Sequence, residues 1–306
     1  MIIKISKDLK KQEIWANGVE LASIMGHDRD KGKRVLTFPE SKKQFVTSFN
    51  NPVLMTDNYR ISQLPSSTRD TLFSLFSSKP RIVEYDGVSV FWDETHINVW
   101  CPSIDTVLFA KALAEVIKNK KNVYSAVEIG CGSGFLSKYL LAKSKSLKSL
   151  LVNDLNPYAV KCAMDNIHDS RANFYQGDGL KKIKNEKYDL MICNPPYIPR
   201  PRSIDDNPYE GVGLLNYLMH EGQKHLNPGG MIITNISSLC WDIVTKKKTQ
   251  MPMQIIDKMT VPLKVNNIMN NKQWLNYLIK KCHLVTKPKH GNTYWQDIII
   301  VSLMNK

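Results

Sequence analysis

The feature that most constrains the fold is a regular alternation of strand-like and helix-like segments between residues 122 and 240. Apolar β-branched runs predict strands over 124–129, 149–153, 173–176, 188–193 and 231–237. Helical spacing of apolar residues predicts helices over 135–144, 157–167 and 213–226, and Asn156 is suited to cap the second. Alternation with short connections predicts an α/β fold, a mostly parallel sheet with helices on both faces. Ligands of such sheets bind outside the carboxyl ends of the strands.

The flanking segments are less regular. Two β-rich runs, 81–92 and 96–102, surround the turn-prone residues 93–95 and predict a hairpin, and a helix is expected over 103–120. Near the C-terminus we expect a helix over 273–281, then an antiparallel pair formed by 283–288 and 294–303. Residues 1–80 show no clean period, and the lysine- and methionine-rich segment 241–271 is left unassigned.

Composition points to a globular protein. The 306 residues are 42% hydrophobic, which suffices for a buried core. There is no run of eighteen apolar residues, and the first charge comes at Lys4, so we expect a cytoplasmic location. The six cysteines contain no C-x-x-C pair, which predicts reduced thiols and no metal site.

The net charge of +14 is unevenly distributed. From Thr245 onward eleven lysines face only Asp257 and Asp297. Such an excess favours an anionic partner such as RNA, DNA or the ribosome. Lysines mixed with Asn and Gln are equally typical of a solvated surface, so both interpretations stay open.

The first strand of the alternating region runs into a glycine-rich loop, "VEIGCGSGFL". Gly130, Gly132 and Gly134 allow the backbone to turn sharply and approach a ligand, and the following helix directs amide donors toward it. A dinucleotide-binding loop has its third glycine one residue later, where this chain has Phe135, which argues against NAD.

Two acidic residues follow the next two strands. Asp154 ends the second strand, and a carboxylate at this place is suited to binding ribose hydroxyls. Asp178, in "QGDGL" after the third strand, is suited to accept a hydrogen bond from an adenine amino group. Either residue taken alone also fits a turn or a helix cap.

The fourth strand stops at "CNPPYIP", where two prolines prevent the strand from continuing. Asn194 offers a side-chain carbonyl and Pro195 a main-chain carbonyl. Two acceptors can bind both hydrogens of a planar NH2 group, while the ring of Tyr197 covers its flat face. This arrangement fits an amide or a nucleobase amine as the ligand.

The order "VEIGCGSG", "VNDLNP", "GDG" and "CNPPYIP" resembles the class I S-adenosylmethionine-dependent methyltransferases that carry an N-P-P-Y motif. It looks most like the HemK-type protein-glutamine N5-methyltransferases, which modify release factors or a ribosomal protein. The resemblance covers about residues 81–306. It implies a Rossmann-like, mostly parallel seven-stranded sheet, with residues 1–80 as a small N-terminal region and candidate substrate-recognition part. Residues 81–121 would link it to the S-adenosylmethionine-binding domain, 122–306.

The resemblance also implies roles for the motif residues. The three glycines would border the methionine part of S-adenosylmethionine, and Glu128 would support the loop and the cofactor's amino group. Ribose would be held by Asp154 and adenine by Asp178. The nucleophile would be held by Asn194, Pro195 and Tyr197, and Asn194 would also contact the cofactor. The reaction would be an in-line displacement at the sulfonium methyl group without a metal.

Three functions stay open. The first is methylation of a protein side-chain amide, glutamine in a translation component. The second is methylation of an adenine N6 or guanine N2 amine in nucleic acid. The third is a cofactor-binding scaffold without activity, against which the acceptors at Asn194 and the ring of Tyr197 argue. The chain departs from HemK-type enzymes at 102–107, "PSIDTV", where those carry Pro-Arg-Pro-x-Thr-Glu.

Overall fold

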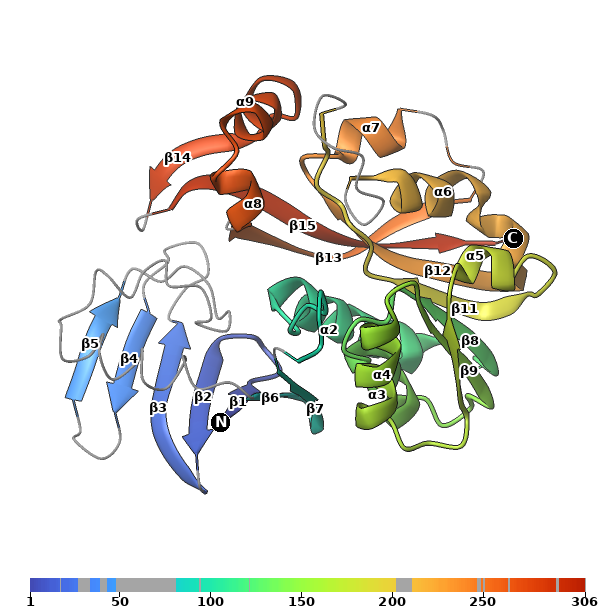
Figure 1. Ribbon diagram of the computed structural model, residues 1–306, viewed down its shortest axis with the longest axis horizontal. Coiled ribbons are helices and arrows are strands. Elements are labelled where there is room, and N and C mark those ends of the chain that lie inside the picture. The colour runs from blue at the N-terminus through green and yellow to red at the C-terminus, as the bar shows by residue number, and fades with distance from the viewer. Residues whose placement is uncertain are drawn as a thin grey trace.

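The computed structural model arranges the chain as two sheets with helices between them (Figure 1). It describes residues 1–16, 18–26, 34–38, 43–47, 81–93, 95–120, 122–201, 211–246, 249, 251–263, 265–289 and 292–305.

The larger sheet has the strand order β10-β9-β8-β11-β12-β15-β13, and β14 pairs with β15 beside this path. The first five strands are parallel, and β15 runs antiparallel to β12, β13 and β14. The strands are β8 (Ser125–Ile129), β9 (Ser149–Asp154), β10 (Ala172–Gln176), β11 (Tyr188–Cys193), β12 (Leu226–Ser237), β13 (Met253–Pro262), β14 (Val285–Lys289) and β15 (Asn292–Met304). The predicted Rossmann-like, mostly parallel sheet is confirmed, but it has eight strands instead of the predicted seven, because β14 also pairs with β15.

Helices cover both faces of this sheet, as predicted. Residues of α2 (Ile104–Asn119), α3 (Phe135–Lys143) and α4 (Pro157–Asn166) share one buried cluster with Leu190 and Ile192. The opposite cluster contains Met191 and Cys193 together with α6 (Gly213–Glu221) and α7 (Trp241–Thr245). Successive residues of β11 therefore face opposite helical layers, which explains why the strand reads as a continuous apolar run.

The remaining helices are short or peripheral. They are α5 (Gly179–Lys182), the 3₁₀ helix η2 (Gly222–His225), α8 (Asn266–Met269) and α9 (Lys272–Lys281). The helix expected over 213–226 is thus divided into α6 and η2, since glycine at 222 weakens an α-helix. Among the described residues, no helix is long and apolar enough to cross a membrane.

The N-terminal residues form a second sheet, which the sequence pattern did not predict. Its order is β5-β4-β3-β2-β1-β6-β7, with strands β1 (Ile2–Ile5), β2 (Lys11–Ala16), β3 (Val19–Gly26), β4 (Arg34–Phe38), β5 (Lys43–Thr47), β6 (Arg81–Tyr85) and β7 (Val88–Trp92). One reason is that polar Gln12 occupies a fully buried strand position and interrupts the apolar alternation. The stretch 48–52 and most of 26–34, which look turn-rich, lie outside the described residues.

The hairpin lies elsewhere than expected. It joins β6 to β7 through Asp86 and Gly87, both of which have positive φ angles, 48° and 77°. Asp-Gly is a strong two-residue hairpin turn because both central positions tolerate this conformation. Residues 96–102, expected as its second strand, are irregular.

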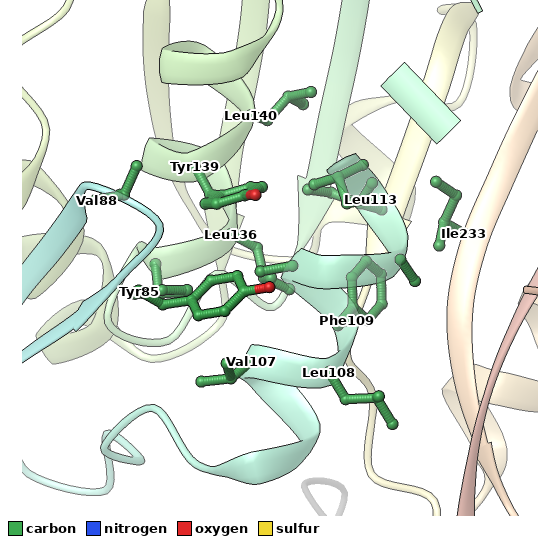
Figure 2. Packing of buried hydrophobic residues seen from close by; sticks show 14 of the residues in the cluster. Tyr85, Val88, Val107, Leu108, Phe109, Leu113, Leu136, Tyr139, Leu140 and Ile233 are labelled. Carbon is green, nitrogen blue, oxygen red and sulfur yellow. The ribbon is translucent and has the colours of Figure 1, made fainter. Parts of the chain in front are cut away.

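The two sheets share one core through α2 and α3. Tyr85 and Val88 of the hairpin lie close to Leu136 and Tyr139 of α3 (Figure 2). On the other side, Ile233 of the large sheet belongs to the same cluster (Figure 2). Burial on both sides holds α2 in place, and the N-terminus of α2 reaches the end of the large sheet that carries the sequence motifs.

The unassigned segment 241–271 contains α7, β13 and α8. β13 forms the edge of the large sheet, and seven of its first eight side chains are exposed or half-buried, in no regular alternation. A strand at an edge buries little, so its sequence carries no regular apolar pattern. The predicted pair formed by β14 and β15 is present.

Candidate active site

The glycine loop is fixed to the neighbouring strand and leaves open space above it. The amides of Gly130 and Cys131 both donate to the main-chain oxygen of Asn153, over 2.9 and 2.8 Å. Gly130 and Gly132 have φ angles of 76° and 52°, and a Cβ atom at either position would have no neighbour within 4 Å. The backbone at these two glycines therefore forms an uncovered cradle suited to a ligand.

Gly134, unlike Gly130 and Gly132, lies in a closely packed environment. A Cβ atom there would lie 2.9 Å from the Cα and Cβ atoms of Ala163 in α4. Close packing of α3 on α4 accounts for this glycine, and its predicted contact with the cofactor stays a prediction.

Asp154 lies at the end of β9 beside the cradle. Its Oδ2 accepts from the Gly132 amide over 3.0 Å, and its Oδ1 accepts from the Asn156 amide over 2.9 Å. Burial raises the pKa of this carboxyl, although the backbone hydrogen bonds act in the opposite direction. Leu155 next to it leaves 46% of its surface exposed. A carboxylate and an exposed apolar side chain thus border the open loop.

Asp178 caps α5. Its Oδ1 accepts from the amides of Leu180 and Lys181 over 3.1 and 3.2 Å. The buried side chain of Asn153 holds this loop in place, because its Nδ2 donates to the main-chain oxygens of Tyr175 and Gly177 over 3.0 and 2.8 Å. Asn153 was missed at the sequence level, because an asparagine at a strand end gives no signal of a partner on the next strand.

Glu128, in β8 just before the glycine loop, is buried, with 1% of its surface exposed. Ser137 of α3 donates a hydrogen bond to its Oε2. Burial raises the pKa of Glu128 to about 8, and the Ser137 hydrogen bonds only partly offset this effect. Glu128 therefore ties β8 to α3 as a carboxyl group that is largely protonated at neutral pH.

The acceptor loop, residues 194–199, is organised by an acidic residue that the sequence analysis did not assign to the site. Asp105, in the first turn of α2, accepts from Asn194 Nδ2 over 3.1 Å and from Tyr197 Oη over 3.4 Å, both with its Oδ2. Ser103 donates to the other oxygen of the same carboxylate. Because Nδ2 of Asn194 is held by Asp105, Oδ1 is left as the acceptor of that carboxamide.

The far end of the acceptor loop rests on α9. The buried indole of Trp274 donates to the main-chain oxygen of Pro199 over 2.8 Å. The guanidinium of Arg200 lies over the same ring, 5.4 Å from its centroid. Ile198 also packs on the cluster around Trp274. The loop is therefore held at one end by α2 and at the other by α9.

Asn166 is a further residue that the sequence did not reveal. Its Nδ2 donates to the main-chain oxygens of Phe91 and Ser133 over 2.9 and 3.2 Å, and its Oδ1 accepts from the Phe91 amide over 2.7 Å. This buried amide joins the hairpin to the glycine loop. Its partners lie far away in the chain, so no local pattern could have indicated them.

No metal site is apparent in the part of the chain that the structure describes, since no group of three or more His, Cys, Asp or Glu side chains is arranged to hold one. All six cysteines are free thiols. Burial raises the pKa of Cys131 and of Cys193, so both thiols are protonated at neutral pH.

Fold and site together define the class of protein. The strand order, the open glycine loop before a helix and the acid at the next strand end are those of a Rossmann-like methyltransferase. The uncovered cradle and the Asp154 carboxylate fit S-adenosylmethionine, which needs a close backbone approach and an acceptor for its ribose.

Comparison with known proteins agrees with this class. The chain belongs to the methyltransferase small domain family, whose model matches residues 99–255, just over half of the chain. It is an S-adenosylmethionine-dependent methyltransferase, and its predicted likeness to the HemK type is confirmed.

Two relatives illustrate the similarity. The putative protein N5-glutamine methyltransferase of Methanocaldococcus jannaschii is 29% identical over 203 residues, which are 62% of this chain and 98% of that protein. The release factor glutamine methyltransferase of Aquifex aeolicus is 28% identical over 156 residues, 45% of this chain and 55% of that protein. The chain thus spans about half the length of three of the release factor enzymes that it matches.

Proposed function

We propose that this enzyme transfers a methyl group to the side-chain amide nitrogen of a glutamine in a translation factor or ribosomal protein. The observation that carries the proposal is the Asn194 carboxamide, whose nitrogen is bound by Asp105 and whose oxygen remains available. A planar NH2 group needs such acceptors. The printed names of the relatives, protein N5-glutamine and release factor glutamine methyltransferases, support the choice of glutamine.

The cofactor residues are proposed as follows. Gly130 and Gly132 would lie against the methionine part, and Asp154 would accept from the ribose. Asp178 would accept from adenine with Oδ2, since its Oδ1 caps α5. Glu128 would support the loop through Ser137. When bound, S-adenosylmethionine supplies a methyl group on a cationic sulfur.

The chain's own contribution is alignment of the acceptor nitrogen. Asn194 Oδ1 and the main-chain oxygen of Pro195 would accept its two N–H bonds, and the Tyr197 ring would cover its face. An amide nitrogen is a poor nucleophile, so acceptors that favour the positive charge developing on it lower the barrier. Fixed alignment contributes further, because it avoids the entropic cost of bringing the reactants together. One N–H proton is released in the net reaction.

The lysine-rich surface next to the acceptor loop would bind a partner of the enzyme. From Lys258 to Gln296, with Lys258 included, the sequence has seven lysines and no acidic residue. Four of the lysines on or next to α9 and β14 are exposed: Lys272, Lys280, Lys281 and Lys287. Because α9 also holds the acceptor loop, we propose that this surface meets RNA near the methylated protein. Residues 1–80 remain our candidate for a substrate-recognition part.

The same surface favours one second candidate, methylation of an adenine N6 or guanine N2 amine in nucleic acid, where lysines would contact phosphates. The test is to incubate the enzyme with methyl-labelled S-adenosylmethionine and unmethylated cell extract, then divide the product between protease and nuclease. Label released by protease supports the glutamine proposal. Label released only by nuclease contradicts it and supports the second candidate.

A further inference from the structure

The strand beside the acceptor loop carries a second carboxamide, and this one has no hydrogen-bond partner among the described residues. Asn235 in β12 is fully buried, and among the described residues neither its Oδ1 nor its Nδ2 has a hydrogen-bond partner. A buried amide without partners is destabilising, because it has lost its hydrogen bonds to water. Nearly all buried polar groups in native proteins are paired, so this exception requires a reason.

The sheet register puts Asn235 next to Asn194. β11 and β12 are parallel, and the last pair of their ladder joins Cys193 to Thr234. Ile192 and Ile233, one residue earlier, belong to the cluster on the α2 face (Figure 2 shows Ile233). Since strand residues alternate between faces, Asn194 and Asn235 also lie on the α2 face. Adjacent strands are about 4.8 Å apart, so the two residues are neighbours.

Three other side-chain donors at the acceptor loop are already used. Nδ2 of Asn194 and Oη of Tyr197 donate to Asp105, and the Trp274 indole donates to Pro199. A glutamine side chain presents two N–H bonds and one carbonyl oxygen. The proposed acceptors, Asn194 Oδ1 and the Pro195 carbonyl, provide for the nitrogen only, and the oxygen still needs a donor.

We propose that Asn235 is a specificity residue of the acceptor site, whose Nδ2 donates to the carbonyl oxygen of the glutamine side chain. The inference rests on the proposed function and deepens it, since it states how a carboxamide is distinguished from other groups. A site that hydrogen-bonds a polar group discriminates against ligands lacking that group. Because Asn235 is covered in the structure, the acceptor reaches it only when the side chains above it move.

The test replaces Asn235 by leucine, which has the same side-chain branching and number of heavy atoms but no polar atoms. The neighbouring Thr234→Val is the matched control, because Thr234 is also fully buried and its Oγ1 has no partner among the described residues, but it faces α6 and α7. Both changes remove an unpaired polar group, so we expect both to raise Tm.

Only Asn235→Leu should weaken binding of the methyl acceptor. We expect its KM for a glutamine-containing substrate protein to rise about tenfold, the effect of one lost hydrogen bond. The Kd of S-adenosylmethionine, measured by calorimetry without acceptor, should stay unchanged in both variants. If Asn235→Leu does not fold, Asn235→Ala replaces it with the same expected KM.

An unchanged KM in a folded Asn235 variant overturns the inference while leaving the proposed function intact. An equal rise of KM in Thr234→Val also overturns it, because the effect would then be a general one of the strand. If the unaltered enzyme methylates nucleic acid and no protein, the proposed function fails first, and the inference fails with it.

Discussion

At the scale of single residues, the site depends on two carboxyl groups with different surroundings. Asp105 organises the acceptor loop by accepting from Asn194 and Tyr197. Glu128 is buried, with its pKa raised to about 8 by burial. The motif "CNPPYIP" could be read directly, because its residues are adjacent in the chain. Asp105 could not, since its partners are 89 and 92 residues away.

We expect Asp105→Ala to lower kcat roughly tenfold or more, because the Asn194 carboxamide would no longer be held in one orientation. Steady-state methyl transfer measures this, and Glu115→Ala is the control, an exposed acid on the same helix. A kcat equal to that of the control would exclude the positioning role of Asp105.

Glu128 should make stability depend on pH. Its pKa is about 8 in the folded protein and 4.5 ordinarily, so the unfolded chain loses this proton first. Stability is thus fully present below pH 4.5 and declines as pH rises toward 8. Urea unfolding without cofactor should show a shallower decline for Glu128→Gln over this range. Identical slopes for both proteins would mean that Glu128 ionises normally.

At the scale of elements, the alternation of strands and helices was predictable because each segment buries an apolar face. The irregular elements were not. In β2 and β13, apolar and polar residues do not alternate regularly enough to predict a strand. The hairpin turn was predicted at the wrong place, because Asp86 and Gly87 were not recognised as the turn between β6 and β7. Contacts between elements, such as Trp274 with Pro199, depend on the completed fold.

The junction of α3 and α4 gives a prediction for an element. Gly134→Ala combines a positive φ angle, 79°, with a clash against Ala163, so we expect a loss of about 2–4 kcal/mol in unfolding free energy. Gly229→Ala has a similar φ angle, 70°, but open space, and should lose only about 1–2 kcal/mol. Chemical denaturation would contradict this account if both variants lost the same amount.

At the scale of the whole molecule, the N-terminal sheet is attached to the methyltransferase core by a charged contact as well as by apolar packing. Asp86 in the hairpin turn forms ion pairs with Lys7 over 2.6 Å and with Lys143 of α3 over 2.9 Å. It also accepts from the Tyr139 hydroxyl over 2.9 Å. Residues from three separate parts of the chain therefore meet at one carboxylate, which no single stretch of sequence could reveal.

This contact should weaken in acid. Burial alone would raise the pKa of Asp86, but hydrogen bonds from Lys7, Lys143 and Tyr139 outweigh it and lower the pKa from 3.8 to about 2. Its contribution to stability is present above pH 3.8 and is lost as pH falls toward 2. Between pH 5 and pH 2.5, the unaltered protein should lose more unfolding free energy than Asp86→Asn. Equal losses would show that the contact does not stabilise the fold.

We propose that Asn194 holds a glutamine side chain for methyl transfer. Mass spectrometry tests this proposal by mapping the methyl group in a purified translation factor after incubation with the enzyme or with Asn194→Ala. We predict one methyl group on a glutamine side-chain nitrogen. Asn194→Ala should transfer it at a rate at least about 100-fold lower, while its affinity for S-adenosylmethionine stays within about threefold of that of the unaltered enzyme. A methyl group elsewhere, or an unimpaired variant, would contradict the account.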